Sequence, residues 1–415
     1  MSVSALVLAA LLGAVSPPVT SGVTPSDTIT LADALSLAAA GPLVEVAEAE
    51  VALAEADEWQ ARLLPNPEIS YQGYARAIGT PDAINGQQHQ VDLGGPLLLA
   101  GQRRARMRAA RLDTAAVRGQ TCFVRTEIQR QVALRWVELL AVQETVEILS
   151  RGRDALQEAE ELTQTRASRG GQTKYEAERV SAELRALEIE LQTAKVDLRD
   201  ASRRLAIAIG RPKWAPRASG SLEGVARERG AMDIETGYEQ IPAVDLARRE
   251  ERAAAAGVVV ARRERWPVPS IYGGVYATTD GGSASVSFGV ALPIPVFDRG
   301  QARVARARAD SRRARLRTVA VERVAQAEHE RAAEIVRARR QAVRQWDEQL
   351  EDTMPRLRIM AREAYVGGVS SVLELIDAER THLQAHLRGL GLARDLAVAV
   401  IELDAARGSL GDPCG

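Results

Sequence analysis

Several residue types are scarce in this chain of 415 residues, and each shortage narrows the possible architectures. Phe, Trp and Tyr together make up 4% of the residues, which suits long helices better than a thick globular core. The two cysteines, Cys122 and Cys414, are too few for a disulfide framework or a thiolate metal site. Acidic and basic residues nearly cancel to a net charge of -1, so the composition provides no bulk attraction to nucleic acid.

Long apolar runs are also missing beyond the N-terminus, so no transmembrane helix is expected. The run from Ala5 to Val15 has the length of a signal-peptide core and is too short to span a bilayer as a helix. We therefore expect residues 1–22 to be a signal peptide and the protein to be exported. No cysteine follows this run closely, so an N-terminal lipid anchor is not expected.

The chain does contain a long internal repeat. Three co-linear pairs of residues share nearly one offset: Pro67 and Pro269 are 202 residues apart, Gly101 and Gly300 are 199 apart, and Gly170 and Gly368 are 198 apart. Matches that recur in order at one offset indicate a duplication of the whole plan. We therefore expect one interlocked architecture rather than independent domains.

Each copy is expected to hold one helix, two strands and a long helical hairpin. In the second copy Val286, Phe288 and Val290 alternate with small or polar residues, which is the period of a strand with two different faces. The expected strands are 67–77, 87–97, 268–278 and 284–293, and the sequence Gly94-Gly95-Pro96 leaves the end of the second strand open.

The expected helices are longer than those of globular cores. They span about 30–63, 101–168, 173–209, 242–264, 301–366 and 370–407, and apolar heptads predict coiled-coil seams in the hairpins. Pro355 predicts a kink in the helix of 301–366. The expected organisation is a first repeat at 23–209, an irregular equatorial segment at 210–240, a second repeat at 241–408 and a C-terminal tail at 409–415.

Strands of about ten residues with one apolar face have the length of membrane-spanning strands. Four such strands cannot close a barrel, and lipid tolerates no open sheet edge, so several chains must share one barrel. Two chains would give an eight-stranded barrel filled by side chains, whereas three would give twelve strands with room for a passage. If the barrel encloses a passage, the twelve-stranded barrel of a homotrimer is favoured.

Several motifs resemble those of the TolC-like outer-membrane efflux proteins over nearly the whole mature length. They are Thr30-Leu-Ala-Asp-Ala-Leu, Leu64-Pro-Asn-Pro-Glu, Leu292-Pro-Ile-Pro-Val-Phe-Asp-Arg-Gly-Gln and the segment from Gly368 to Ala378. The pieces at 66–68 and 101–106 look most like the heavy-metal-efflux, CzcC-like branch.

The resemblance implies a mainly helical protein with a small β part and an internal duplication. Three chains would form an outer-membrane β-barrel of four strands per chain, in contact with outer-membrane lipid and continued by a coiled-coil α-barrel into the periplasm. The expected partners are two further copies, a periplasmic membrane-fusion adaptor and an inner-membrane pump of the RND type, with no nucleic acid. The implied function is a passive exit duct for pumped substrates, with metal cations as candidate cargo.

The candidate site lies at the ends of the helical hairpins. Glu374 and Asp377 are three residues apart on one helix face, and they match the acidic residues that ring the periplasmic constriction in the resembled family. Six such carboxylates around a three-fold axis would favour cations. Glu176 holds the matching place in the first copy. The tip turns are expected at Gly170 and Gly171 in one hairpin and at Gly367 and Gly368 in the other.

Metal binding, enzymatic activity and other functions are the alternative interpretations of this sequence. His382 and His386 have a spacing that can hold a metal, but no accompanying motif supports it, so no metal site and no cofactor are assigned. No grouping of catalytic residues or cofactor fingerprint is found, so an enzyme is not expected. Alternative functions are a duct for drugs or for type I protein secretion, or a periplasmic coiled-coil scaffold without a channel.

Overall fold

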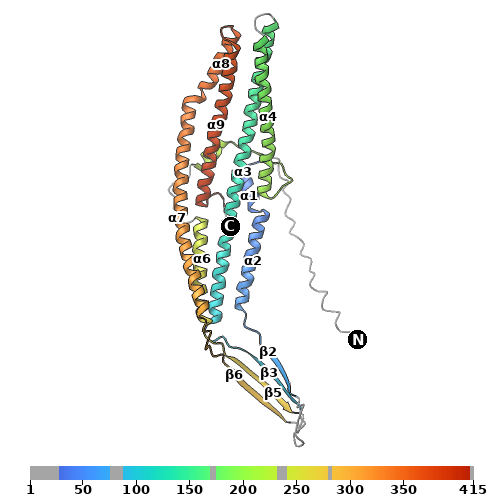
Figure 1. The fold of residues 1–415 in the computed structure, drawn as a ribbon, viewed down its shortest axis with the longest axis vertical. Coiled ribbons are helices and arrows are strands. Elements are labelled where there is room, and N and C mark those ends of the chain that lie inside the picture. The colour runs from blue at the N-terminus through green and yellow to red at the C-terminus, as the bar shows by residue number, and fades with distance from the viewer. Residues whose placement is uncertain (1–27, 75–86, 169–173, 231–240, 279–282, 412–415) are drawn as a thin grey trace, which may run out of the picture.

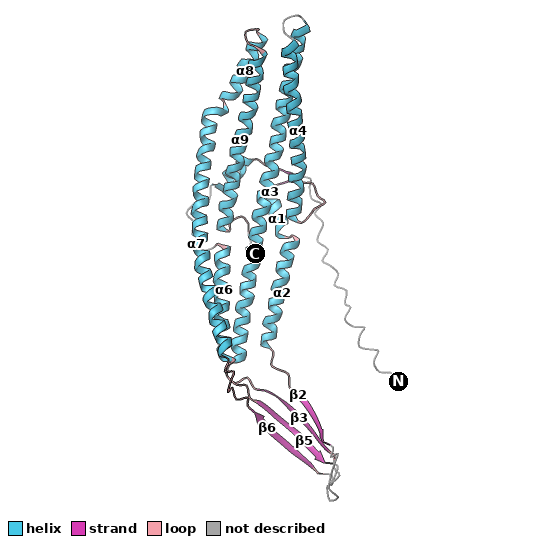
Figure 2. Ribbon diagram, viewed as in Figure 1, coloured by secondary structure: helices cyan, strands magenta, loops and turns pink. Residues whose placement is uncertain are grey.

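The computed structural model describes residues 28–74, 87–168, 174–230, 241–278 and 283–411. Within them the chain forms a long bundle of helices with a four-stranded sheet at one end and two helical hairpin ends at the other (Figures 1 and 2). The expected signal peptide lies outside the described residues. Among those residues, every helix is too short or too polar to cross a membrane.

The sheet draws its strands from both copies of the repeat. It consists of β2 (Glu68–Tyr74), β3 (Gln88–Pro96), β5 (Ser270–Thr278) and β6 (Ala284–Ala291), in the order β2-β3-β5-β6, with every neighbouring pair antiparallel. The four expected strands are confirmed. Because β3 of the first copy pairs with β5 of the second, the two copies cannot be separate domains, and β2 and β6 are left at the edges of the sheet.

The second strand, β3, continues through the Gly94-Gly95-Pro96 sequence because its backbone packs closely on that of β5. β3 runs through Gly94 and Gly95 to Pro96 and pairs with β5 along this whole stretch. A Cβ on Gly94 would lie 2.7 Å from the carbonyl oxygen of Ile271, so the glycine is what lets the neighbouring strand approach.

The two faces of the sheet differ in polarity. Large apolar side chains are open to the surroundings on one face, where Phe288 is 90% exposed and Val286 is 81% exposed. The same face carries Ile69, Tyr71, Val91, Leu93, Ile271, Val275 and Val290. On the other face Asp92 accepts hydrogen bonds from Gln90 at 2.8 Å and from Ser287 at 3.3 Å. The alternation in the sequence therefore becomes one apolar and one polar face.

Four helices form the layer next to the sheet. They are α2 (Pro42–Arg62), α3 (Gln102–Ser168), α6 (Pro242–Arg263) and α7 (Gln301–Trp346). α3 packs between α2 and α6, and α7 packs on the far side of α6 (Figure 1). The outer helices of this layer are therefore α2 and α7, just as the outer strands of the sheet are β2 and β6.

The duplication is visible in matching contacts. Thr121 on α3 donates a hydrogen bond to the carbonyl oxygen of Ala47 on α2 at 3.1 Å, and Thr318 on α7 donates one to Ala247 on α6, also at 3.1 Å. Both long helices start after a glycine in the left-handed conformation, Gly101 with φ 75° and Gly300 with φ 70°. The pair α2–α3 is thus the counterpart of α6–α7.

Away from the sheet the long helices fold back into two hairpins. α4 (Lys174–Ile209) returns along α3, and its buried apolar residues follow the expected heptads. They are Val180, Leu184, Leu187, Leu191, Ala194, Ala201 and Leu205. α9 (Val372–Arg407) returns along α8 (Thr353–Val366) and α7.

The helix expected over 301–366 is interrupted near the predicted place. A stretch of π-helix, η2 (Asp347–Glu351), separates α7 from α8, and Pro355 follows in the first turn of α8. Proline cannot donate to the carbonyl of the preceding turn, so the helix widens just before it. Apolar residues of this rod recur in heptads that include Val343, Leu350 and Leu357, and the seam expected from them is wrong at Leu357, which is 49% exposed.

The middle of the molecule, which we call the waist, holds the largest apolar core. Trp136 of α3 is 1% exposed and donates from Nε1 to the carbonyl oxygen of Ile29 at 3.0 Å. The elements around it are α1 (Leu31–Ala39), β1 (Thr28–Ile29), β4 (Arg217–Ala218) and α5 (Leu222–Gly230). The segment 210–240 was expected to be irregular, but it contributes a strand paired with β1 and a helix whose Leu222 is buried in this core.

One of the two cysteines takes part in a covalent bond. Cys122 lies in α3 and is disulfide-bonded, and a single bond of this kind is compatible with a cysteine count too low for a disulfide framework. A single bond can form with two cysteines if the fold brings them together, and a count contains no information on that proximity.

Candidate functional site

The end of the second helical hairpin is a tight turn between α8 and α9. Gly367 has an ordinary helical backbone, whereas Gly368 has φ 77°, in the left-handed region that favours glycine. Ser371 then caps α9, where its side chain accepts a hydrogen bond from the backbone of Glu374 at 3.4 Å. The structure thus places the turn at Gly367–Gly368 as expected. Gly170 and Gly171 lie outside the described residues.

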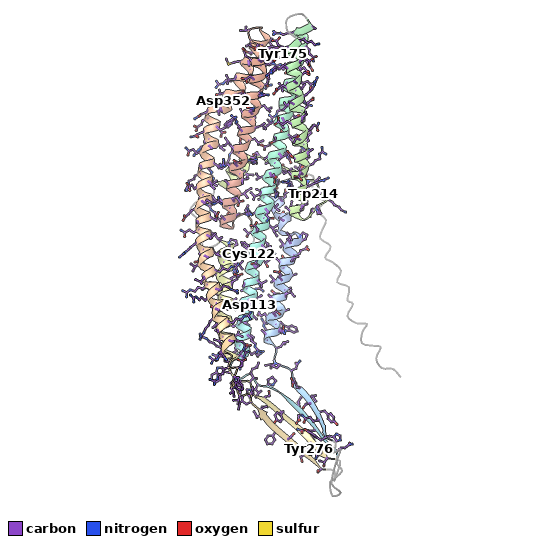
Figure 3. The ribbon with its side chains drawn as sticks, viewed as in Figure 1. Asp113, Cys122, Tyr175, Trp214, Tyr276 and Asp352 are labelled. Atoms are coloured by element: carbon purple, nitrogen blue, oxygen red, sulfur yellow. The ribbon has the colours of Figure 1, made fainter. Side chains whose placement is uncertain are left out.

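The candidate gate residues of this hairpin lie side by side on α9. Glu374 in the first turn and Asp377 three residues later are both exposed, and neither forms an ion pair within the described part of the chain. Glu176 lies in the first turn of α4, on the other hairpin, and is half-buried. The ends of both hairpins are at the same end of the molecule (Figure 1), and Tyr175 marks the first of them in Figure 3.

A buried tyrosine joins the two hairpins just behind their ends. Tyr365 of α8 is 1% exposed, and its hydroxyl lies 3.0 Å from Oγ1 of Thr163 on α3. The guanidinium of Arg166 stacks 4.7 Å above the Tyr365 ring and donates to the carbonyl oxygen of Val366 at 2.7 Å. Val180, Val372 and Leu375 fill the space around the ring. This contact set holds α8–α9 against α3–α4.

Ion pairs add to the contact between the hairpins. The guanidinium of Arg380 on α9 donates from two nitrogens to the two carboxylate oxygens of Glu183 on α4. The shortest N–O distance is 2.7 Å. Arg362 of α8 pairs with Glu158 of α3. These two pairs are largely exposed, so each contributes little on its own.

One ion pair lies within the second hairpin and was missed by the sequence reasoning. Glu379 is 7% exposed and receives two hydrogen bonds from Arg358, at 2.8 and 2.9 Å. A signal was available, because these residues stand at nearly equal distances before and after Gly368 and so must meet across an antiparallel hairpin. The carboxylate closest to the predicted pair is therefore a structural one.

The histidine pair lies further along α9. The rings of His382 and His386 are perpendicular, with centroids 4.4 Å apart. Burial lowers the pKa of His382 to about 4, with further contributions from His386, Arg358 and Arg151, so this imidazole is neutral at pH 7. Within the described ranges no three His, Cys, Asp or Glu residues are grouped so that they could hold a metal ion.

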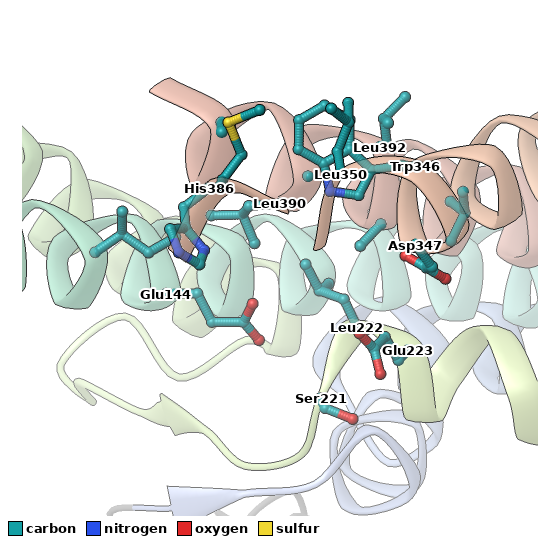
Figure 4. A pocket seen from close by; sticks show the side chains of 16 residues that line it. Glu144, Ser221, Leu222, Glu223, Trp346, Asp347, Leu350, His386, Leu390 and Leu392 are labelled. Atoms are coloured by element: carbon teal, nitrogen blue, oxygen red, sulfur yellow. The ribbon is translucent and has the colours of Figure 1, made fainter. Parts of the chain in front are cut away.

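A pocket of about 340 Å³ opens where the π-helix interrupts the α7–α8 rod (Figure 4). Its walls include the side chains of Glu144, Glu223, Trp346, Asp347, Leu350 and His386. Burial raises the pKa of the Glu144 carboxyl, and the nearby carboxylates of Glu223 and Glu147 raise it further. The widened turn thus leaves an acidic hollow against α9.

The outer helices of the sheet-side layer carry opposite charge. α2 has six carboxylates and one arginine, whereas α7 has eight arginines and two carboxylates between residues 303 and 323. On α2 the apolar residues Leu43, Val46 and Leu53 are 61 to 68% exposed and lie on one stripe. On α7 Leu316 is 61% exposed. Each edge of the molecule is thus apolar and charged, with opposite signs on the two edges.

Comparison with solved structures shows the fold class. A membrane protein from Pseudomonas aeruginosa matches with a TM-score of 0.76 and 18% identity, over 92% of this chain and 91% of that chain. The outer membrane protein VceC from Vibrio cholerae matches with a TM-score of 0.74 and 18% identity, over 92% and 97%. CusC matches with a TM-score of 0.73 and 18% identity, over 91% of each chain. The fold is that of TolC-like channels.

Sequence comparison shows which proteins the chain is similar to. Residues 238–409 match the outer membrane efflux protein family. A curated relative, the cobalt-zinc-cadmium resistance protein CzcC of Cupriavidus metallidurans, is 26% identical over 91% of this chain and 89% of its own length. The protein is therefore an efflux channel of the outer membrane that extends into the periplasm. Members of the family are transport ducts rather than enzymes, and they work with an adaptor and an inner-membrane pump.

Proposed function

We propose that three copies of this chain enclose a continuous exit duct, and that the duct carries metal cations delivered by an inner-membrane pump through a periplasmic adaptor. The observation that carries the proposal is the unfinished sheet, with an exposed apolar face and an open edge on each side. Lipid accommodates the apolar face but not the edges, because backbone groups without partners are costly there. Pairing β6 of one copy with β2 of the next removes the edges.

The outer helices support the same closure. α7 of one copy would lie beside α2 of the next, which brings the arginine-rich edge against the acidic edge. Among the described residues, five arginines on this part of α7 have no ion-pair partner: Arg306, Arg308, Arg312, Arg315 and Arg323. On α2 the same holds for Glu45, Glu50 and Asp57. The opposite charges of α7 and α2 favour contact between these two helices of neighbouring copies. They disfavour a contact of α7 with α7 or of α2 with α2.

The duplication predicts the register between copies. Ile69 corresponds to Ile271, and their partners Leu93 and Val290 therefore correspond as well. Within the chain Leu93 pairs with Gly273, whose counterpart in the first copy is Tyr71. Val290 of one copy should then face Tyr71 of its neighbour. Both residues lie on the apolar face, as a consistent register requires.

The same mapping applies to the helices. Gly119 of α3 lies against α6, where a Cβ would be 3.7 Å from the Cα of Leu246. The counterparts of these two residues are Leu316 on α7 and Val46 on α2, which are both 61% exposed. We expect them to meet between copies and to bury the apolar surface that a single chain leaves open.

Two measurements test the assembly. Light scattering in mild detergent should give the mass of three chains, and a monomer or dimer would count against the proposal. Tyr71→Cys combined with Val290→Cys should cross-link neighbouring chains up to a covalent trimer, whereas Tyr71→Cys with Val286→Cys should not. Cross-linking of the second pair instead would show that the register is wrong while leaving the trimer intact.

The cargo is proposed from the sequence relative, whose name describes resistance to cobalt, zinc and cadmium. Glu374 and Asp377 support it, because three copies would place six exposed carboxylates near one axis at the entrance. Cells lacking the protein should accumulate Zn²⁺, Co²⁺ or Cd²⁺ when the cognate pump is active, and the wild-type gene should reverse this. Unchanged metal content with increased retention of drugs would favour a drug duct, and loss of a secreted protein would favour type I secretion.

The ends of the hairpins are proposed as the docking site for the adaptor. They are the part of the chain farthest from the sheet, and Gly367 and Gly368 form a narrow turn between exposed residues (Figure 1). Gly170 and Gly171, at the matching place in the sequence of the first copy, are proposed for the same docking role and lie outside the described residues. Cross-linking to the adaptor from Val369→Cys, which replaces an 87% exposed side chain, should succeed, and cross-linking from Arg315→Cys near the sheet should not.

A further inference from the structure

The polar face of the sheet carries charge of one sign. The strands β2, β3, β5 and β6 contain no Lys or Arg, and their carboxylates are Glu68 and Asp92. The register pairs Asp92 with Ser70 on β2 and with Gly274 on β5. Glu68 lies two residues before Ser70, so both carboxylates are on the face opposite to that of Phe288. The face that would look into a closed barrel is therefore purely acidic in its charged groups.

The side chain of Asp92 is held flat against the sheet. It lies over Gly274, where a Cβ would be 2.3 Å from Oδ1, and it is 8% exposed. Gln90 donates from Nε2 to both carboxylate oxygens, at 2.8 and 3.1 Å, and Ser287 donates to Oδ1 at 3.3 Å. These donors are neutral, and Asp92 forms no ion pair with any residue that the structure describes. The charge of Asp92 is thus fixed on the wall without a compensating cation.

A large side chain on the same face also lies along the wall. The ring of Tyr272 covers Gly289, where a Cβ would be 2.3 Å from the tyrosine hydroxyl oxygen. Twelve strands about 4.8 Å apart and tilted by about 40° would enclose a barrel with a radius of roughly 12 Å. With side chains flat on its wall, such a barrel leaves a wide lumen in which a cation keeps its hydration shell. Wall charges then act on the cation through their field rather than by coordination.

We propose that Asp92, together with Glu68, makes the barrel a second cation-selective element of the duct, separate from the carboxylates at the hairpin ends. The proposal rests on the trimer proposed above, in which the polar faces of three sheets surround one passage. Each copy then contributes two carboxylates to the wall and no Lys or Arg. Rings of carboxylates favour cations and disfavour anions. The species favoured in the barrel is a hydrated cation, which includes the metal ions proposed as cargo.

The range of this field predicts a dependence on salt. Asp92 would lie about 10 Å from the barrel axis, since its side chain is flat on the wall. The Debye length is about 10 Å at 0.1 M salt and about 3 Å at 1 M. The preference of the barrel for cations should therefore be clear near 0.1 M and largely screened near 1 M.

Reversal potentials of the purified full-length protein in planar bilayers, measured under a KCl gradient, test the proposal. The background is Glu374→Gln with Asp377→Asn, so that the hairpin ends add no charge. Near 0.1 M salt this protein should still be more permeable to K⁺ than to Cl⁻. Adding Asp92→Asn, which keeps the size of the side chain, should lower the permeability ratio several-fold. Adding Glu334→Gln, at an exposed carboxylate on α7, is the control and should leave the ratio unchanged.

A variant that adds charge keeps the test decisive if Asp92→Asn does not assemble. Gln72 lies on the same face of β2 and accepts a hydrogen bond from the hydroxyl of Tyr74 at 2.6 Å, which a glutamate can also accept. Gln72→Glu should therefore fold normally and raise the permeability ratio. Equal permeability to K⁺ and Cl⁻ in the background protein, or a ratio that neither variant changes, would overturn the proposal and leave the duct intact. Absence of conductance in the wild type would instead overturn the duct, and this proposal with it.

Discussion

The waist and the hairpin ends are stabilised by different forces. At the waist Trp136, Leu139 and Leu205 are at most 1% exposed within one continuous apolar core. Near the ends one buried aromatic, Tyr365, is accompanied by a few polar contacts between the hairpins. Burial of a large apolar side chain contributes several kcal/mol to the free energy of unfolding, whereas an exposed ion pair contributes about 1 kcal/mol or less. The ends can therefore rearrange while the waist stays folded.

The largest effect is expected at the waist. Trp136→Ala removes a side chain that is 1% exposed, together with one of the two hydrogen bonds to the carbonyl oxygen of Ile29, which also accepts from the backbone of Ser219. We expect a loss of about 3–5 kcal/mol in the free energy of unfolding. Trp136→Phe keeps most of the ring and should cost much less. Denaturant unfolding of both variants checks this, and equal losses would indicate that the hydrogen bond rather than the core dominates.

The next effect is expected in the second hairpin. Glu379→Gln replaces a carboxylate that is 7% exposed and leaves Arg358 without its charged partner. We expect a loss of about 2 kcal/mol, less than for a fully buried pair because Arg358 is partly exposed. Glu374→Gln, at an exposed position, is the matched control and should leave stability unchanged. Thermal melts of the two variants separate the structural carboxylate from the proposed functional one.

A smaller and local effect is expected at the turn. Gly368→Val places a branched side chain at φ 77°, which should cost about 1–2 kcal/mol, whereas Gly367→Ala keeps an ordinary helical conformation. The first variant should lose docking to the adaptor while its sheet still inserts into the membrane, and the second should keep both. Export at the normal rate in Gly368→Val would show that the turn is not the docking element.

The smallest effect concerns pH. The pKa of His382 is lowered to about 4 in the folded chain from an ordinary 6.5, chiefly by burial. The neutral ring is thus favoured by folding, and this stability is present above pH 6.5 and is lost as the pH falls toward 4. Arg151, Arg358 and His386 all oppose protonation. His382→Gln should therefore melt with a weaker dependence on acid than the wild type, and identical pH profiles would contradict this.

The sequence was sufficient where a local pattern determines the outcome. Alternation in Val286, Phe288 and Val290 identified β6, and heptads in α4 identified the residues that pack on α3. Pro355 marked the interruption of the rod, although the π-helix begins eight residues earlier because the strain is taken up in the preceding turns.

What the sequence did not reveal depends on distant residues meeting. α5 and β4 are stabilised by the core around Trp136 and have weak local signals. The Glu379–Arg358 pair needs the position of the hairpin turn. The candidate site could be named as Glu374 and Asp377 from spacing and resemblance, and the structure adds that both are exposed on one helix.

The most direct test of the account is the conductance of the purified protein in planar bilayers. Wild type should conduct cations and be blocked by trivalent cations, because three copies would bring Glu374 and Asp377 around one axis. Glu374→Gln with Asp377→Asn should still conduct but lose most of the block, while Glu334→Gln, at an exposed carboxylate on the shaft of α7, should behave as wild type. Unchanged block in the double variant would show that these carboxylates lie outside the passage, and absence of any conductance would contradict the duct itself.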